Sequence, residues 1–142
     1  MYACCQGLLR IPIWATPVVK PSPAVKGLFK KDYWRGPMLS VETLKTKLDQ
    51  GEDVLVLDVR TAADYVDVEG HIPQAHNIPV EDLSRRLNEL TEYRARPIAI
   101  VCRTDKRSLK AAKLLAQKSF AEVHVVKGGM TEWNRLGYNI DH

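Results

Sequence analysis

Two short runs of purely apolar residues constrain the fold of this 142-residue chain more than any other feature. Residues 54–57 read Val-Leu-Val-Leu, and residues 98–101 read Ile-Ala-Ile-Val. A strand that is apolar at every position is buried on both of its faces, which is typical of the inner strands of a parallel sheet. The two runs therefore predict a sheet that is covered on both sides.

Segments with helical periodicity precede and follow these runs. Helices are predicted after the N-cap residue Ser40, after Pro79, and from about 108 to 120, and residues 123–126 form a further short strand. Strands that alternate with helices pair in parallel through right-handed crossovers. The predicted fold class is α/β, with an open, mostly parallel sheet of about five strands and helices on both faces.

The first 37 residues differ in composition from the remainder. Residues 1–37 carry a net charge of +5 and several prolines, whereas residues 38–142 carry a net charge of −1. We predict a proline-rich, basic N-terminal extension over 1–37 and one folded domain over 38–142. The domain has no basic stripe with interleaved aromatic residues, so no nucleic-acid partner is expected. No apolar run approaches the roughly 18 residues that a membrane span needs.

The chain has three cysteines, Cys4, Cys5 and Cys102. Three cysteines cannot all pair within one chain, and neither a Cys-x-x-Cys motif nor a histidine-rich cluster offers metal-ligand spacing. We therefore expect no metal and no cofactor. A reducing compartment, the cytoplasm, is expected, with Cys102 as a free thiol.

Cys102 ends the second apolar run and opens a polar loop before the third predicted helix. Ligands of open α/β sheets bind beyond the carboxyl ends of the strands. Arg103, Lys106 and Arg107 outnumber Asp105 in this loop, and the helix N-terminus adds free N–H groups and a positive dipole end. Together these groups favour a thiolate and can hold an anion. Cations are otherwise unfavourable at a helix N-terminus, so we predict a reactive cysteine rather than a core-filling one.

Three segments of residues 38–142 resemble the rhodanese superfamily. Residues 58–79, DVRTAADYVDVEGHIPQAHNIP, are similar to the family pattern DVR…E[FY]…GHIPGAxNIP. Residues 102–108, CRTDKRS, are similar to the active-site pattern CRxGxRS. Residues 126–138, VKGGMTEWNRLGY, are similar to the closing pattern L-x-GG…W…GY. Each pattern is moderately specific, and their shared order and spacing make the resemblance strong.

The resemblance implies a rhodanese-like fold and a sulfurtransferase whose nucleophile, Cys102, forms a persulfide. A small anionic donor of the thiosulfate or polysulfide type would supply the sulfane sulfur, and a thiol, cyanide or a protein cysteine would accept it. Asp58 and Arg60 are implied to be structural residues near the site. The implied substrate-binding residues form the loop after the nucleophile: Arg103, Thr104, Asp105, Lys106, Arg107 and Ser108.

The chain departs from the family pattern at three positions. Asp105 stands where glycine is usual, a position that favours glycine if its φ is positive. We also expect the negative charge of Asp105 to weaken binding of a dianion such as thiosulfate. Asp64 replaces a glutamate and Gln74 replaces a glycine. The segment 66–69 is also about two residues longer than usual in the family. We expect these differences to affect packing more than chemistry.

Two alternatives to a sulfurtransferase stay open. The first is a non-catalytic rhodanese-like binding or regulatory module, in which Asp105 marks a decayed loop. The second is a small phosphatase or arsenate reductase. Those related enzymes have a loop one residue longer than Cys102–Arg107, so the loop length disfavours them.

Overall fold

The computed structural model describes residues 36–142, in which five strands form one sheet. The strands lie in the order β1-β5-β4-β2-β3, and each neighbouring pair is parallel. This arrangement confirms the predicted open, parallel α/β sheet. The strand bounds are β1 (Met38–Leu39), β2 (Leu55–Asp58), β3 (His76–Asn77), β4 (Pro97–Val101) and β5 (Glu122–Val126).

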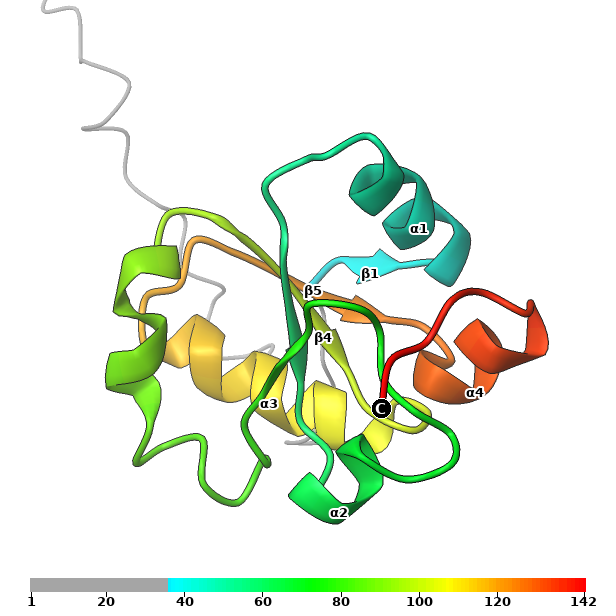
Figure 1. Cartoon of the computed structure of the whole chain (residues 1–142). Coiled ribbons are helices and arrows are strands. Elements are labelled where there is room, and N and C mark those ends of the chain that lie inside the picture. Colours follow the sequence, from blue (N-terminus) through cyan, green and yellow to red (C-terminus); the bar gives the residue numbers. More distant parts are fainter. Residues whose placement is uncertain (1–35) are drawn as a thin grey trace, which may run out of the picture. The chain divides into compact units, whose positions relative to one another are not determined.

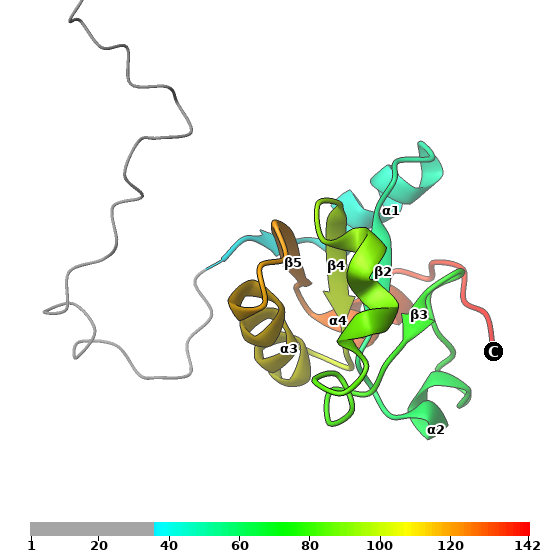
Figure 2. The same cartoon turned by 90° about the vertical axis from the view of Figure 1, so that its left-hand side faces the viewer.

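Helices cover both faces of the sheet (Figure 1). One face carries α1 and α4, and the other carries α3 and a 3₁₀ helix, η4, as the view turned by 90° also shows (Figure 2). The short helix α2 follows β2. The bounds are α1 (Val41–Asp49), α2 (Ala62–Tyr65), η4 (Leu87–Tyr93), α3 (Lys106–Gln117) and α4 (Gly129–Arg135).

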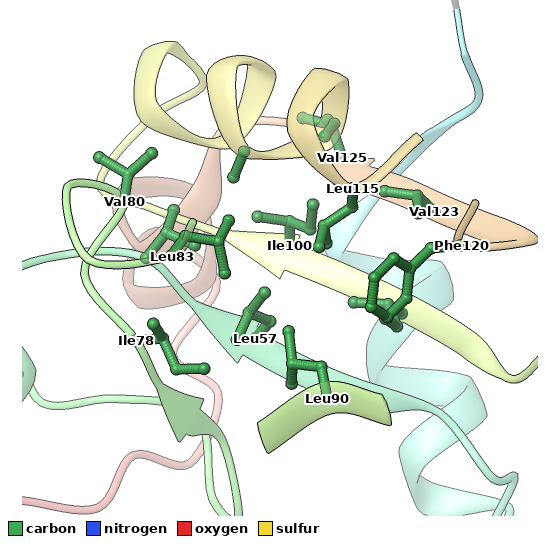
Figure 3. Close-up of a cluster of buried hydrophobic side chains, with 14 of the residues drawn as sticks. Leu57, Ile78, Val80, Leu83, Leu90, Ile100, Leu115, Phe120, Val123 and Val125 are labelled. Atoms are coloured by element: carbon green, nitrogen blue, oxygen red, sulfur yellow. The ribbon is translucent and has the colours of Figure 1, made fainter. Parts of the chain in front are cut away.

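Alternate residues of β4 enter two separate hydrophobic clusters. Ile100 packs with Leu115 of α3 on one face, in the cluster that Figure 3 shows. Ala99 and Val101 pack on the opposite face with Trp133 of α4. The uninterrupted apolar run in β4 is therefore explained by burial on both sides.

The prediction of an α-helix after Pro79 is wrong. The chain forms turns there and then the 3₁₀ helix η4. Leu87, Leu90 and Tyr93 recur at every third position, which matches the three residues per turn of a 3₁₀ helix. Leu90 is fully buried in the 3₁₀ helix, as expected for the predicted α-helix.

Helix α3 begins two residues before the predicted start, and its N-cap is Asp105. Lys106, Arg107 and Ser108 therefore belong to the first helical turn rather than to the preceding loop. The segment after Cys102 is thus a very short connection into the helix.

Residues 1–35, with Cys4 and Cys5, lie outside the described residues, so the division of the chain at residue 37 stays a prediction. No helix within residues 36–142 has the length and apolar character that a bilayer crossing needs.

Candidate active site at the end of strand β4

Cys102 follows directly after β4, whose neighbours in the sheet are β2 and β5. It is a free cysteine with 1% of its surface exposed, and it packs at the edge of the cluster that contains Ile100 and Ala111. The predicted nucleophile is therefore placed at the carboxyl edge of the sheet, where ligands of this fold class bind.

The turn after Cys102 presents a series of unbonded backbone N–H groups. Within residues 36–142, none of the N–H groups from Arg103 to Ser108 has a hydrogen-bond acceptor. The first bonded N–H of α3 is that of Leu109, which donates to the Asp105 carbonyl at 2.9 Å. Consecutive free N–H groups at a helix start form a binding site for an anion.

Helix α4 fixes the direction of these N–H groups. Met130 N–H donates to the Cys102 carbonyl at 2.8 Å, and Thr131 N–H donates to the Arg103 carbonyl at 3.0 Å. The C=O and N–H of a trans peptide point in opposite directions. The N–H groups of Arg103 and Thr104 therefore point away from α4.

Gly129 allows α4 to approach the loop this closely. Its φ is +52°, and a Cβ at this position would lie 2.2 Å from the Cys102 carbonyl oxygen and 2.7 Å from that of Thr104. No side chain fits there without displacing the loop backbone. The double glycine of residues 128–129 is thus a packing contact of the candidate site.

Asp105 occupies its position without the strain that a positive φ would impose. Its φ is −132°, and its carboxylate accepts a hydrogen bond from the Gly128 N–H at 2.8 Å. The side chain thereby links the loop to the turn before α4. A backbone N–H that donates to a carboxylate stabilises its negative charge, and Asp105 therefore adds a negative charge near the site.

The two arginines of the loop both face carboxylates of the preceding motif. Arg107 Nη1 lies 3.3 Å from Asp64 Oδ2, and Arg103 Nη2 lies 3.6 Å from Glu69 Oε2. The Asp64 carboxylate thus contacts a predicted substrate-binding residue, while the expectation that Asp64 affects packing more than chemistry stays a prediction. Burial raises the pKa of Asp64, but hydrogen bonds with Arg107 and Thr61 outweigh it and hold the pKa below its ordinary value of 3.8.

Ser108 is completely buried in the first turn of α3, and its hydroxyl has no hydrogen-bond partner among the described residues. A buried polar group without a partner is uncommon in native proteins and is often functional. Thr104 and Lys106 are exposed. The structure brings all the predicted substrate-binding residues into one turn, while their individual roles stay predictions.

Asp58 and Arg60 form an ion pair in the interior. Arg60 Nε lies 3.0 Å from Asp58 Oδ1, and Arg60 Nη2 lies 2.8 Å from Asp58 Oδ2. The same Nη2 donates to the Gly70 carbonyl at 2.8 Å, and both ion-pair side chains are at most 1% exposed. The pair therefore ties the end of β2 to the start of the Gly-His-Ile-Pro turn.

Sequence reasoning missed the acidic partners of the loop arginines and the contact made by the double glycine. Asp64 occupies a motif position that is usually also acidic, which was a usable signal. Glu69 gave no such signal. Among residues 36–142, no group of three or more His, Cys, Asp or Glu side chains is arranged to hold a metal ion.

Known proteins resemble this chain in sequence and in structure. The family model for the rhodanese-like domain matches residues 40–136. A putative sulfur carrier protein of Bacillus subtilis is 36% identical over 97 residues, which are 68% of this chain and 50% of that protein. A sulfurtransferase of Allochromatium vinosum is 34% identical over 99 residues, which are 70% of this chain and 89% of that protein. The rhodanese-like domain of an Anabaena protein has a TM-score of 0.67 at 30% identity, covering 75% of this chain and 80% of that one.

Proposed function

This chain belongs to the rhodanese-like domain family, and on that basis we propose that it is a sulfurtransferase in which Cys102 carries the sulfur as a persulfide. The proposal rests chiefly on the unbonded N–H groups from Arg103 to Ser108, which follow the end of β4 and open helix α3. A cysteine that only fills space gains nothing from such a row of donors. The sulfurtransferase relative from Allochromatium vinosum, which aligns over most of its own length, supports the same activity.

In the proposed reaction, the Cys102 thiolate attacks the outer sulfur of a donor. A bond forms between Sγ and that sulfur while the sulfur–sulfur bond of the donor breaks, and sulfite or a thiolate leaves with the electron pair. The loop N–H groups stabilise the negative charge on the bound sulfur, and the buried Ser108 hydroxyl, which has no partner among the described residues, supplies a further donor. Arg103 and Arg107 hold the anionic part of the donor.

The second half of the reaction returns the enzyme to its starting state. A thiol, cyanide or a protein cysteine attacks the outer sulfur of the persulfide, and Cys102 leaves as a thiolate. We include a cytoplasmic, reducing location in the proposal, because Cys102 must be free of disulfides to react. No cofactor is required for either step.

Intact mass spectrometry tests the proposal directly. After incubation with thiosulfate or polysulfide, the chain should gain about 32 Da, the mass of one sulfur, and Cys102→Ser should gain nothing. Dithiothreitol should remove the added mass. If no donor of either type adds sulfur to the wild-type chain, the sulfurtransferase proposal fails.

A non-catalytic binding module is the second candidate, and the 1% exposure of Cys102 in a hydrophobic cluster favours it. Iodoacetamide distinguishes the two candidates under native conditions. A reactive thiolate should be alkylated within minutes, whereas an inert core cysteine should react only after unfolding. Hydrolysis of an aryl phosphate that depends on Cys102 would instead favour the phosphatase alternative.

A further inference from the structure

The charges around the candidate site balance, which differs from the positive loop that the sequence indicates. Asp64 and Glu69 each contact one loop arginine, at 3.3 Å and 3.6 Å. With these two carboxylates counted, three cations face three anions: Arg103, Lys106 and Arg107 against Asp64, Glu69 and Asp105. A dianion that binds either arginine is repelled by the neighbouring carboxylate, so its binding is weakened.

We propose that Asp64 and Glu69 determine which sulfur donor reacts with Cys102. By holding Arg107 and Arg103, this carboxylate pair makes the site favour an organic persulfide of low charge over a dianion such as thiosulfate. The inference rests on the proposed sulfurtransferase function and specifies its donor class.

Neighbouring side chains anchor the backbone at both acidic residues. The Thr61 hydroxyl accepts a hydrogen bond from the Asp64 N–H at 3.1 Å and caps α2. The Asn134 side chain of α4 donates to the Glu69 carbonyl at 3.1 Å. The pKa of Asp64 is lowered by Arg107 and Thr61 in spite of partial burial, so its carboxylate is charged at neutral pH. The backbone at both acidic residues is thus anchored beside the arginines.

Apolar side chains lie between the two carboxylates in the sequence. Val66 and Val68 are 61% and 80% exposed, the highest values among the exposed large hydrophobic residues that the structure describes. An exposed apolar pair in the segment that carries Asp64 and Glu69 suits the carbon skeleton of an organic donor and offers nothing to thiosulfate. Asp67 lies between the valines, but its carboxylate accepts from the Val68 N–H at 2.7 Å.

The two donors place different charges in the site. With a neutral persulfide, R–S–SH, the Cys102 thiolate takes the outer SH group, and R–S⁻ leaves with the electron pair and one negative charge. With thiosulfate, the thiolate takes the outer sulfur, and sulfite leaves with two negative charges. Carboxylates beside the loop therefore oppose the thiosulfate reaction more strongly, both on entry of the donor and on departure of the product.

The experiment compares sulfur loading of Cys102 by thiosulfate, a dianion, and by benzyl persulfide, an apolar donor with at most one negative charge, with intact mass as the readout. In the double variant Asp64→Asn, Glu69→Gln, the ratio of the thiosulfate rate to the benzyl persulfide rate should rise about tenfold, because two partly exposed ion pairs are removed. The matched control Asp67→Asn removes one charge from the same segment without freeing an arginine, and its ratio should stay within about twofold of the wild type.

An unchanged ratio in the double variant, or an equal rise in Asp67→Asn, would overturn the inference. Failure of the proposed function is a separate outcome, in which neither donor loads wild-type Cys102. Calorimetric binding of thiosulfate to Cys102→Ser still tests the carboxylate pair in that case. Addition of Asp64→Asn and Glu69→Gln to that background should tighten binding about tenfold, and unaltered affinity would refute the role of the pair.

Discussion

Arg60 and the two arginines near Cys102, Arg103 and Arg107, all pair with carboxylates but differ in their exposure to solvent. Arg60 is fully buried. Its guanidinium donates hydrogen bonds to both carboxylate oxygens of Asp58 and to the Gly70 carbonyl. Arg103 is half exposed and lies 3.6 Å from its carboxylate, while Arg107 is about one-third exposed at 3.3 Å. The buried ion pair of Arg60 therefore has a structural role. The partly exposed arginines, Arg103 and Arg107, can instead release their carboxylates and bind a ligand.

Substitution of Arg60 should have the largest effect. Arg60→Met leaves the Asp58 carboxylate buried without its partner, and we expect a loss of about 3–5 kcal/mol in the free energy of unfolding. Urea denaturation measures the loss, and far-UV circular dichroism shows whether the variant folds at all. The matched change Arg107→Met should cost less than about 1 kcal/mol. Equal losses in the two variants would remove the distinction between interior and loop arginines.

Gly129→Ala should rank second, because it disturbs the loop through its backbone. The new Cβ would lie 2.2 Å from the Cys102 carbonyl oxygen at a φ of +52°. Strain and overlap together should cost about 2–5 kcal/mol. Gly51→Ala is the control, since Gly51 also has a positive φ but nothing lies within 4 Å of its Cβ position. That change should cost only about 1–2 kcal/mol, and thermal denaturation of both variants checks the difference.

Substitution of Arg107 should slow the loading of sulfur onto Cys102 more than it destabilises the fold. Arg107→Met should slow thiosulfate loading of Cys102 by about 10- to 100-fold, because a charge-assisted contact to the donor is lost. Arg96→Met removes another partly exposed arginine, paired with Asp53 at 2.8 Å, and should leave the loading rate unaltered. Comparable slowing in both variants would point to a general charge effect instead of a local contact.

The smallest expected effect concerns pH and the Asp64–Arg107 pair. The pKa of Asp64 is lowered in the folded chain, so its stabilising contribution is complete above 3.8, its ordinary value, and is lost as the pH falls through the lowered pKa. At neutral pH, the free energy of unfolding of the wild type should exceed that of Asp64→Asn by less than about 1 kcal/mol. Urea denaturation between pH 2 and pH 7 should show the two stabilities converging in acid. A difference that persists at the acidic end would contradict this assignment.

The sequence predicts the centre of the sheet well and its surroundings less well. Strands β2 and β4 are predicted to within a residue because burial on both faces leaves a continuous apolar run. The position of Cys102 at a strand end follows directly from that pattern. The 3₁₀ helix was missed because leucines three and four residues apart fit both kinds of helix.

The contacts around the loop arginines could not be predicted from local patterns. Asp64 and Arg107 are 43 residues apart and come together only through the pairing of parallel strands. The left-handed φ of Gln74, +67°, explains why a glycine is usual there. At Asp105, by contrast, the φ of −132° shows that the position does not need a left-handed conformation.

The hydrogen bonds from Met130 and Thr131 to the loop carbonyls have a consequence for biosynthesis. Cys102 is synthesised before α4, whose residues supply these hydrogen bonds. The turn after Cys102 therefore acquires its α4 contacts only once that helix has docked with Trp133 buried. The turn is in this sense completed late in folding, and an incomplete chain would carry the cysteine without these contacts.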